Sequence, residues 1–266
     1  MPGAWGLKMV DHITSRDNPW LKALRRLAQD NQAYRKQGEA WLEGEHLVDA
    51  VVRHKHPVRT LVCAESHWSR LPTLWQSLGE RQVVLPDPLF QAISGLESPA
   101  GVGVLLALPE ASSLVPGVAT VVLDRLQDAG NVGAILRSAA ALGFGQVLAL
   151  SGTAALWSPK VLRAGMGAHL ALRLIEGASP DDLQGLGVPI LATSSHQGPF
   201  LHELTRQGAL PHPAAWLLGH EGQGVSDALM AQANLTVRIA QPGGQESLNV
   251  AAAAAICLHA SATISL

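Results

Sequence analysis

Three separated segments of the chain combine a strand, a glycine-containing loop and the start of a helix. In RIAQPGGQESLNVAAAAAICLHA at 238–260, Ser247, Leu248 and Asn249 open an alanine-rich helix. Backbone N–H groups at a helix N-terminus, with a hydroxyl and an amide beside them, can hold a ligand and place reacting atoms. The segments NVGAILR at 131–137 and LLGHEGQG at 217–224 belong to the same arrangement of strand, loop and helix start. We therefore expect one site built from three pieces of the sequence.

The first segment places polar side chains along a short stretch of helix. Asn131 is predicted to cap a helix that carries Gly133 and Arg137. Gly133 lacks a Cβ, so either another backbone or a ligand can approach it. Arg137 lies one turn further along and shares a broad face with Gly133. Taken alone, the segment is a weak signal and fits an ordinary cap followed by a surface arginine better.

The second segment surrounds one carboxylate with glycines. Gly219, Gly222 and Gly224 flank Glu221, and Ser226 is predicted to cap the next helix. The order G-x-x-G-x-G differs from the dinucleotide-binding pattern G-x-G-x-x-G. The G-x-S-x-G pattern of serine hydrolases is also absent. A dinucleotide-dependent oxidoreductase and a serine hydrolase are therefore disfavoured, although a lone glycine-rich loop can also be a plain turn.

Composition predicts a globular protein without a large positive field. The chain has 266 residues, of which 47% are hydrophobic and 15% charged, with a net charge of −2. A polyanion would have to bind a local patch. The first sixty residues hold half of the basic side chains, and an RNA-contacting surface there competes with a solvated face balanced by acidic neighbours. The candidate RNA-binding residues are Arg16, Lys22, Arg25, Arg26, Arg35 and Lys36.

Several kinds of site and location are disfavoured by the sequence. Cys63 and Cys257 lie far apart and are predicted to be buried free thiols. The 11 histidines show no metal-binding spacing, so we expect no metal. No stretch has the length of about 20 apolar residues that a membrane span needs, and no secretion signal is recognisable. A cytoplasmic location is expected, and Met1 and Met9 are both possible natural starts.

The proline- and serine-containing stretch 109–117 is predicted to link an N-terminal domain, 1–108, to a C-terminal domain, 118–266. The N-terminal part is expected to be a small α/β module. Its expected helices begin after Asn18 and span 39–53, 69–79 and 87–95, and its expected strands are 60–64, 82–86 and 102–108.

The C-terminal part alternates apolar strands with helices, which predicts a mostly parallel sheet covered on both faces. The expected strands are 120–124, 146–150, 189–194, 215–219 and 235–240, with helices at 131–143, 158–168, 227–233 and at the C-terminus. In such sheets, ligands bind beyond the carboxyl ends of the strands. The three loops each follow a strand and could gather there.

Taken together, NVGAILR, LLGHEGQG and IAQPGGQESLNVAAA resemble, in order and spacing, the three signature motifs of the SpoU (TrmH-like) class of RNA ribose 2′-O-methyltransferases in the SPOUT superfamily. The segment SPKVLRAGMGA at 158–168 is similar to a further segment of that family. Residues 13–48 and 97–108 resemble the family's N-terminal substrate-binding domain. Two departures are Ala129 in place of proline and Ala251 in place of a frequent serine.

The resemblance implies a trefoil-knotted C-terminal domain, S-adenosylmethionine as the cofactor and a homodimer. As catalytic residues it implies Arg137, Asn131, Glu221, Ser247 and Asn249. As cofactor-binding residues it implies Thr193, Leu218, Gly219, Glu221, Gly222, Ile239, Gln241, Ser247 and Leu248. The expected substrate is a ribose 2′-hydroxyl of 23S (large-subunit) rRNA; the alternatives are the same reaction on tRNA, or a non-catalytic RNA-binding or ribosome-assembly protein.

The chemistry of methyl transfer bears on one of these roles. A ribose hydroxyl is a poor nucleophile while protonated, so a positioned proton acceptor should help. The family's proposed base is Arg137, but an arginine is effectively always protonated in proteins. We therefore expect Arg137 to clamp a neighbouring phosphate and stabilise developing alkoxide charge.

Overall fold

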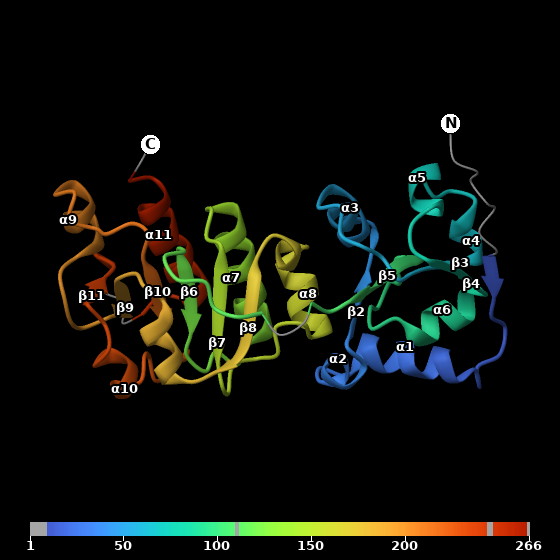
Figure 1. Ribbon diagram of the computed structural model, residues 1–266, viewed down its shortest axis with the longest axis horizontal. Helices are drawn as coiled ribbons and strands as arrows, with labels where there is room; N and C mark the ends of the chain where they lie inside the picture. The colour runs from blue at the N-terminus through green and yellow to red at the C-terminus, as the bar shows by residue number, and fades with distance from the viewer. Residues whose placement is uncertain (1–9, 110–111, 244–246, 265–266) are drawn as a thin grey trace. The chain divides into compact units, whose positions relative to one another are not determined.

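The computed structural model describes residues 10–109, 112–243 and 247–264 (Figure 1). Contacts divide the chain into two compact units. One comprises Met1–Pro109 with Trp157–Pro159, and the other comprises Glu110–Leu156 with Lys160–Leu266. Of the stretch 109–117, Val115 exchanges backbone hydrogen bonds with the side chain of Gln146 in the second unit. The two possible starts, Met1 and Met9, lie outside the described residues.

The N-terminal unit is built on a five-stranded mixed sheet in the order β1-β4-β3-β5-β2. Its strands are β1 (Val10–His12), β2 (Glu39–Glu43), β3 (Thr60–Ala64), β4 (Arg81–Leu85) and β5 (Val102–Ala107). Its helices are α1 (Pro19–Gln29), α2 (Ala33–Gln37), α3 (Glu45–Arg53), α4 (Glu65–Trp68), α5 (Thr73–Gln76) and α6 (Asp87–Ile93). The Asn18 side chain caps α1 by accepting hydrogen bonds from the backbone N–H groups of Trp20 and Leu21.

The predicted helix over 39–53 is wrong in its first third. Residues Glu39–Glu43 form β2, which pairs antiparallel with β5, and only α3 is helical. Gly44, at φ +113°, separates the two elements in a conformation that L side chains rarely adopt. Leu42 is fully buried in β2. Its place in the apolar pattern therefore suits a strand as well as the predicted helix. The predicted helix 69–79 is likewise reduced to α5.

The C-terminal unit is an α/β fold around a six-stranded sheet in the order β11-β9-β10-β6-β7-β8. Its strands are β6 (Thr120–Leu123), β7 (Gln146–Leu150), β8 (Arg173–Ala178), β9 (Ile190–Ser194), β10 (Ala215–Leu218) and β11 (Leu235–Arg238). Its helical elements are α7 (Ala129–Ala141), α8 (Pro159–Gly165), η1 (Ala168–Leu170), η2 (Pro180–Gly185), α9 (Leu201–Arg206), α10 (Asp227–Met230) and α11 (Val250–Ala262). All neighbouring strands run parallel, which confirms the predicted parallel sheet.

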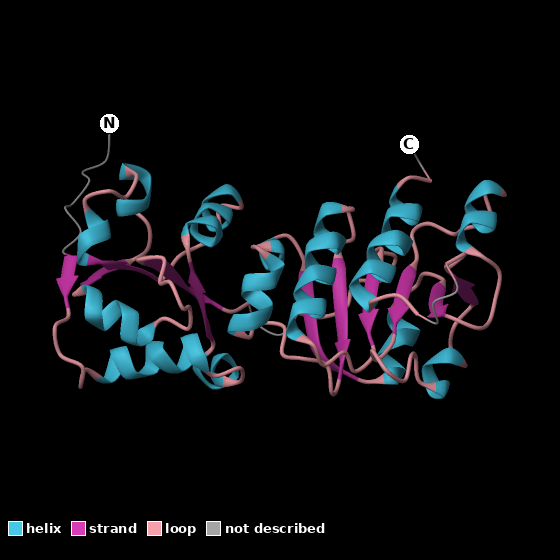
Figure 2. Ribbon diagram, turned by 180° about the vertical axis from the view of Figure 1, so that it is seen from behind, coloured by secondary structure: helices cyan, strands magenta, loops and turns pink. Residues whose placement is uncertain are grey.

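One strand of this sheet lies outside the sequence prediction. Strand β8 carries Arg173, Glu176 and Gly177, which interrupt the apolar run that marks the other strands. It is an edge strand, paired only with β7 among the described strands, and an edge strand tolerates charged residues. Helices α7 and α11 contact each other and lie side by side along the sheet (Figure 2).

A close approach of two helices explains the glycine in the first segment. A Cβ on Gly133 would lie 2.4 Å from the Cβ of Ala164 and 2.8 Å from the backbone nitrogen of Gly165. The space beside Gly133 is therefore filled by α8, so another backbone occupies it. A larger residue there would force the two helices apart.

Both cysteines are free and buried, as predicted. Burial raises the pKa of each thiol to about 12, and for Cys63 the carboxylate of Asp87 adds to the effect. In the described part of the chain, no helix is long and apolar enough to cross a membrane. Within the same residues, no cluster of three or more His, Cys, Asp or Glu side chains is placed to hold a metal ion.

One buried histidine gives the C-terminal unit a predicted pH dependence. His169 is buried and its Nε2 lies 2.8 Å from the carbonyl oxygen of Leu156. Burial lowers its pKa from 6.5 to about 4, and the Leu156 carbonyl partly opposes this shift. The unfolded chain therefore binds a proton more readily than the folded one. This contribution to stability is full above pH 6.5 and is lost as the pH falls towards 4.

We expect the free energy of unfolding to drop by roughly 3 kcal/mol over that interval because of His169 alone. Chemical denaturation at a series of pH values measures it. In His169→Leu this pH-dependent loss of unfolding free energy should be absent, whatever the absolute stability of the variant. Identical pH slopes for the two proteins would contradict the assignment.

Candidate active site

The loops after β6 and β10 meet at the carboxyl edge of the parallel sheet. These strands are neighbours, with Leu123 and Leu218 in register at their ends. Because the strands run in the same direction, the loops that follow them start side by side. The first loop leads into α7, and the second, which carries Glu221, leads into α10.

Three side chains from the three separated segments form one hydrogen-bonded chain. The amide nitrogen of Asn131 donates to Oε1 of Glu221 at 3.3 Å. The amide nitrogen of Asn249 donates to Oδ1 of Asn131 at 2.9 Å. The three residues are 28 to 118 positions apart in sequence, and tertiary folding alone brings them together.

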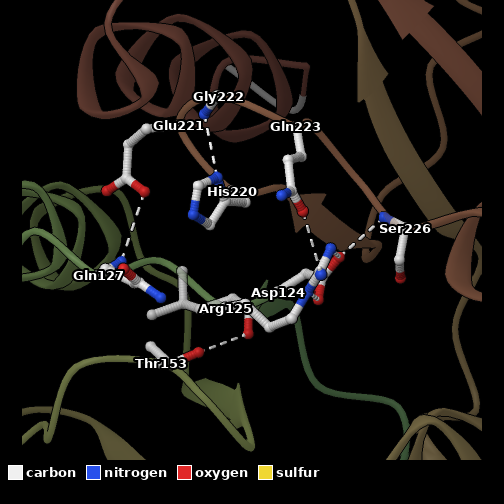
Figure 3. Close-up of polar contacts among 10 residues, drawn as sticks. Asp124, Arg125, Gln127, Thr153, His220, Glu221, Gly222, Gln223 and Ser226 are labelled. Atoms are coloured by element: carbon white, nitrogen blue, oxygen red, sulfur yellow. Dashed lines mark hydrogen bonds and ion pairs between the residues drawn. The ribbon is translucent and has the colours of Figure 1, made fainter.

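The Glu221 carboxylate also fastens the start of α7. It accepts hydrogen bonds from the backbone N–H groups of Gln127 at 3.4 Å and Asp128 at 3.2 Å; Figure 3 shows the contact with Gln127. Burial by itself would raise the pKa of Glu221. Hydrogen bonds from its own backbone, from Asp128, from Asn131 and from Gln127 outweigh that effect and hold the pKa below its usual range. Glu221 is thus a fixed negative charge at neutral pH.

The predicted cap of α7 is wrong by three residues. Asp128 is the N-cap, and its Oδ1 accepts from the backbone N–H of Asn131 at 2.7 Å. Ala129, where the family has proline, is the first helical residue, a position that proline favours. Asp128 therefore takes the capping role, which leaves the Asn131 amide free to join Glu221 and Asn249.

Asn249 both caps a helix and joins the site. Its Oδ1 accepts from the backbone N–H groups of Ala251 and Ala252 at 2.9 and 3.2 Å, so it is the N-cap of α11. Its amide nitrogen points to Asn131. An aspartate would cap equally well but could not donate to Asn131, so the amide serves both contacts.

The loop 219–226 closes on itself. A Cβ on Gly219 would lie 2.0 Å from the backbone nitrogen of Val225, so only glycine fits there. Gly224 has a φ of +71°. Ser226 is the N-cap residue of α10, as predicted, although its side chain makes no capping hydrogen bond. Its backbone N–H donates to the buried carboxylate of Asp124 at 2.8 Å. These glycines therefore serve the fold of the loop itself.

The remaining predicted site residues are not all joined to this chain. Thr193 is the last residue but one of β9, and its hydroxyl donates to the carbonyl of Leu217 on β10 at 3.2 Å. Leu218 is buried, Ile239 and Gln241 are half-buried, and Gly222, Ser247 and Leu248 are exposed. Arg137 is exposed on α7, six residues beyond Asn131, and pairs with no other residue in the described part of the chain.

The six predicted RNA-binding residues of the N-terminal unit are all exposed. Lys22 and Arg25 lie on α1 and are engaged locally, by Asp17 at 2.9 Å and by Gln29 at 3.3 Å. The guanidinium of Arg35 lies over the ring of Tyr34. Arg26 also lies on α1, Lys36 on α2, and Arg16 precedes α1. Both helices thus present cations to solvent.

Sequence reasoning missed the residues that hold the two loops together. Asp128 could have been found as an Asx residue just before a helical pattern. Asp124, Arg125 and Gln127 gave no such signal, since their roles arise from contacts across the sheet edge. The resulting site offers a fixed carboxylate, two amides and a helix N-terminus, and the exposed guanidinium of Arg137 lies six residues beyond Asn131 on the same helix. These groups suit the binding of a polar ligand beside a polyanion.

The family profile described as the SpoU rRNA Methylase family matches residues 119–259, more than half of the chain. The 23S rRNA (guanosine(2553)-2′-O)-methyltransferase RlmP of Bacillus subtilis is 29% identical over 82% of this chain and 86% of its own length. The 23S rRNA (uridine(2479)-2′-O)-methyltransferase of Streptomyces viridochromogenes is 28% identical over 93% of this chain and 90% of its own. An AdoMet-bound rRNA methyltransferase structure from Sinorhizobium meliloti is 25% identical, covering 95% and 97% of the chains with a TM-score of 0.79.

The fold and the site thus define an α/β RNA methyltransferase. The chain belongs to the SpoU rRNA Methylase family, and the resemblance found in the three motifs is confirmed.

The hydrogen bonds of Glu221 generate a prediction about the loops. Glutamine in place of Glu221 loses the negative charge and turns an N–H₂ group towards backbone donors. We expect amide exchange of residues 124–137 to accelerate on the order of tenfold, since charge-assisted bonds to that segment are lost. Hydrogen–deuterium exchange with mass spectrometry measures this.

Glu203→Gln on α9 is the matched control, because it neutralises a carboxylate of the same unit at a distance from these bonds. Unchanged exchange in Glu221→Gln would mean that the carboxylate does not hold the start of α7.

Proposed function

We propose that this chain transfers a methyl group from S-adenosylmethionine to a ribose 2′-hydroxyl of 23S rRNA. The observation that carries the proposal is the hydrogen-bonded chain Glu221–Asn131–Asn249, which joins all three family motifs at one sheet edge. The Bacillus and Streptomyces relatives, which act on 23S rRNA, support the substrate. They methylate different nucleosides, a guanosine and a uridine, so the base is left open.

The residues at the sheet edge fit the cofactor. The Oε1 atom of Gln241 is buried and meets no hydrogen-bond donor among the described residues. S-adenosylmethionine carries amino groups that can supply a donor, and the AdoMet-bound relative supports its binding in this fold. We assign Gln241, Thr193, Leu218, Gly219, Gly222, Ile239, Ser247 and Leu248 as the residues that would hold it. Bound there, it supplies an activated methyl carbon.

The protein's own task is alignment and charge stabilisation. In-line displacement needs the hydroxyl held in the direction of the methyl carbon and shielded from water. The exposed guanidinium of Arg137 is assigned to a neighbouring RNA phosphate and to the developing alkoxide, since its fork of donors suits both. Asn131, Ser247 and Asn249 are assigned to orienting the substrate and loop, and Glu221 to holding the loop backbone.

We assign different roles to the two domains, which the linker 109–117 joins. Residues 118–266 are assigned to catalysis and 1–108 to binding folded RNA through Arg16 and the cations of α1 and α2. Exposure of all six cations supports this, because phosphate contacts need accessible charge. We place the enzyme in the cytoplasm.

The C-terminal domain is proposed to be knotted. Strand β11 lies at the edge of the sheet, two strands from β10, yet α11 packs against β10 and α7. The chain therefore returns from the edge to the middle of the sheet after β11. That return supports threading of the C-terminal segment through an earlier loop.

A homodimer is proposed to form on α11. This helix is apolar on nearly every side, and such helices are normally buried all round. Nevertheless Ala252 is exposed and Ile256 is 42% exposed. The exposed stripe lies on the helix that Asn249 caps, so a second copy seated on it would approach the site.

We expect Ile256→Glu to weaken this dimer, raising its dissociation constant on the order of 100-fold, because a two-fold interface would bury both carboxylates. Sedimentation velocity over a range of concentrations measures it. Leu74→Glu on α5, which alters an exposed leucine of the other unit, should leave association unchanged. Equal association of both variants would argue against α11 as the interface.

The function is tested by mapping ribose methylation of rRNA and tRNA in cells with and without the protein. We expect one 23S nucleotide to lose its methyl group. Wild-type protein and Arg206→Ala, a change at an exposed cation of α9, should restore it, whereas Arg137→Ala should restore less than about a hundredth of the activity. Loss confined to tRNA would overturn the substrate, and no loss in either RNA would overturn the enzyme assignment.

A further inference from the structure

Arg125 has a backbone conformation that calls for a reason. It is the second residue after β6 and has a φ of +58°, in the left-handed region that non-glycine residues rarely occupy. Such strain persists only where the surroundings fix the residue, and it clusters at functional sites. None of the three signature motifs includes Arg125.

The side chain of Arg125 forms a fork on a buried carboxylate. Its Nε donates to Oδ1 of Asp124 at 2.8 Å, and its Nη2 donates to Oδ2 at 3.4 Å. The Asp124 side chain is 3% exposed, so the guanidinium balances a charge that water barely reaches. The same Oδ2 accepts from the backbone N–H of Ser226, at the far end of the Glu221 loop.

The third nitrogen of the guanidinium reaches the middle of that loop. Nη1 of Arg125 donates to Oε1 of Gln223 at 3.4 Å, as Figure 3 shows. Gln223 is two residues after Glu221 and three before Ser226. The loop after β7 passes close to the stem of Arg125, because a Cβ on Gly152 would lie 3.3 Å from its Cγ.

The loop 219–226 is therefore attached to the β6–α7 loop at two places. Glu221 binds Gln127, Asp128 and Asn131, and the Asp124–Arg125 pair binds Ser226 and Gln223. The first attachment contains two proposed catalytic residues, Glu221 and Asn131. The second lies nearer the strand ends and shares no atoms with the first.

We propose that Arg125 is a positioning residue, which holds the loop 219–226 so that Glu221 reaches the start of α7 and the cofactor-binding residues Gly219 and Gly222 keep their places. This inference rests on the proposed function for its catalytic consequence. The positive φ of Arg125 turns its side chain back to Asp124 while the fork still spans to Gln223. A lysine could pair with Asp124, but a single ammonium lacks the planar fork that binds both partners at once.

The test compares Arg125→Ala, Arg125→Lys and Gln223→Ala in the full-length protein. Three quantities are measured: the melting temperature, hydrogen–deuterium exchange of residues 217–230, and the dissociation constant for S-adenosylmethionine by calorimetry. Arg125→Ala should lower the melting temperature, accelerate exchange in the loop on the order of tenfold and weaken cofactor binding about five- to tenfold. Gln223→Ala should change exchange and binding in the same direction at an unchanged melting temperature.

Arg125→Lys separates positioning from simple stabilisation. We expect lysine to restore the melting temperature, by pairing with Asp124, but not the protection of the loop or the affinity for the cofactor. Restoration of all three by lysine would reduce Arg125 to a structural ion pair and overturn the proposal, as would wild-type exchange in Arg125→Ala and Gln223→Ala. Arg206→Ala is the control for loss of a cation.

The two proposals fail separately. A wild-type protein that does not bind S-adenosylmethionine would overturn the proposed function, whereas loop exchange tests Arg125 without any ligand. The double variant Arg125→Ala/Gln223→Ala should accelerate loop exchange no more than Arg125→Ala alone, because both changes remove the same bond. Additive effects would show that Arg125 acts on the loop by another route.

Discussion

The arrangement of the site depends on the hydrogen bonds that the carboxylate of Glu221 accepts. This carboxylate is a negative charge among N–H donors, two from the backbone that leads into α7 and one from Asn131. A neutral acceptor would make weaker bonds, and a carboxylate without these donors would be repelled by RNA brought close to it. The bonds thus fix two loops while they partly neutralise the charge that joins them.

The two asparagines of the hydrogen-bonded chain, Asn131 on the carboxylate and Asn249 on Asn131, lie at points that the fold already fixes. Asn131 lies in the first turn of α7, where Asp128 satisfies the helix cap, and Asn249 is itself the cap of α11. Because α7 and α11 pack against each other, the two amides meet without the entropic cost of ordering a loop. The site residues are therefore held by the rigid starts of two helices. Glycine is needed only where the loop 219–226 folds on itself.

The basic side chains follow a different physical rule. Those on α1 and α2 are exposed, and several pair with neighbours at the surface, where ion pairs contribute little to stability. Such cations can exchange a surface partner for a phosphate at small cost. Arg125 is the opposite case, because it is paired with a buried carboxylate and spans two loops. Local charge, and not the net charge of −2, is what matters for each.

The sequence by itself determined the class of fold and the three motifs, because continuous apolar strands, helix periodicity and glycine spacing are local signals that survive without coordinates. It also determined that both cysteines are buried. Where one apolar spacing suited both strand and helix, as over 39–53, or where polar residues interrupted an edge strand, as in β8, local pattern was insufficient. Only the tertiary structure decided that Gly133 faces α8, that the Asn131 amide joins Glu221 and Asn249, and that Arg125 and Gln223 meet, since each depends on partners distant in sequence whose approach is set by packing across the sheet.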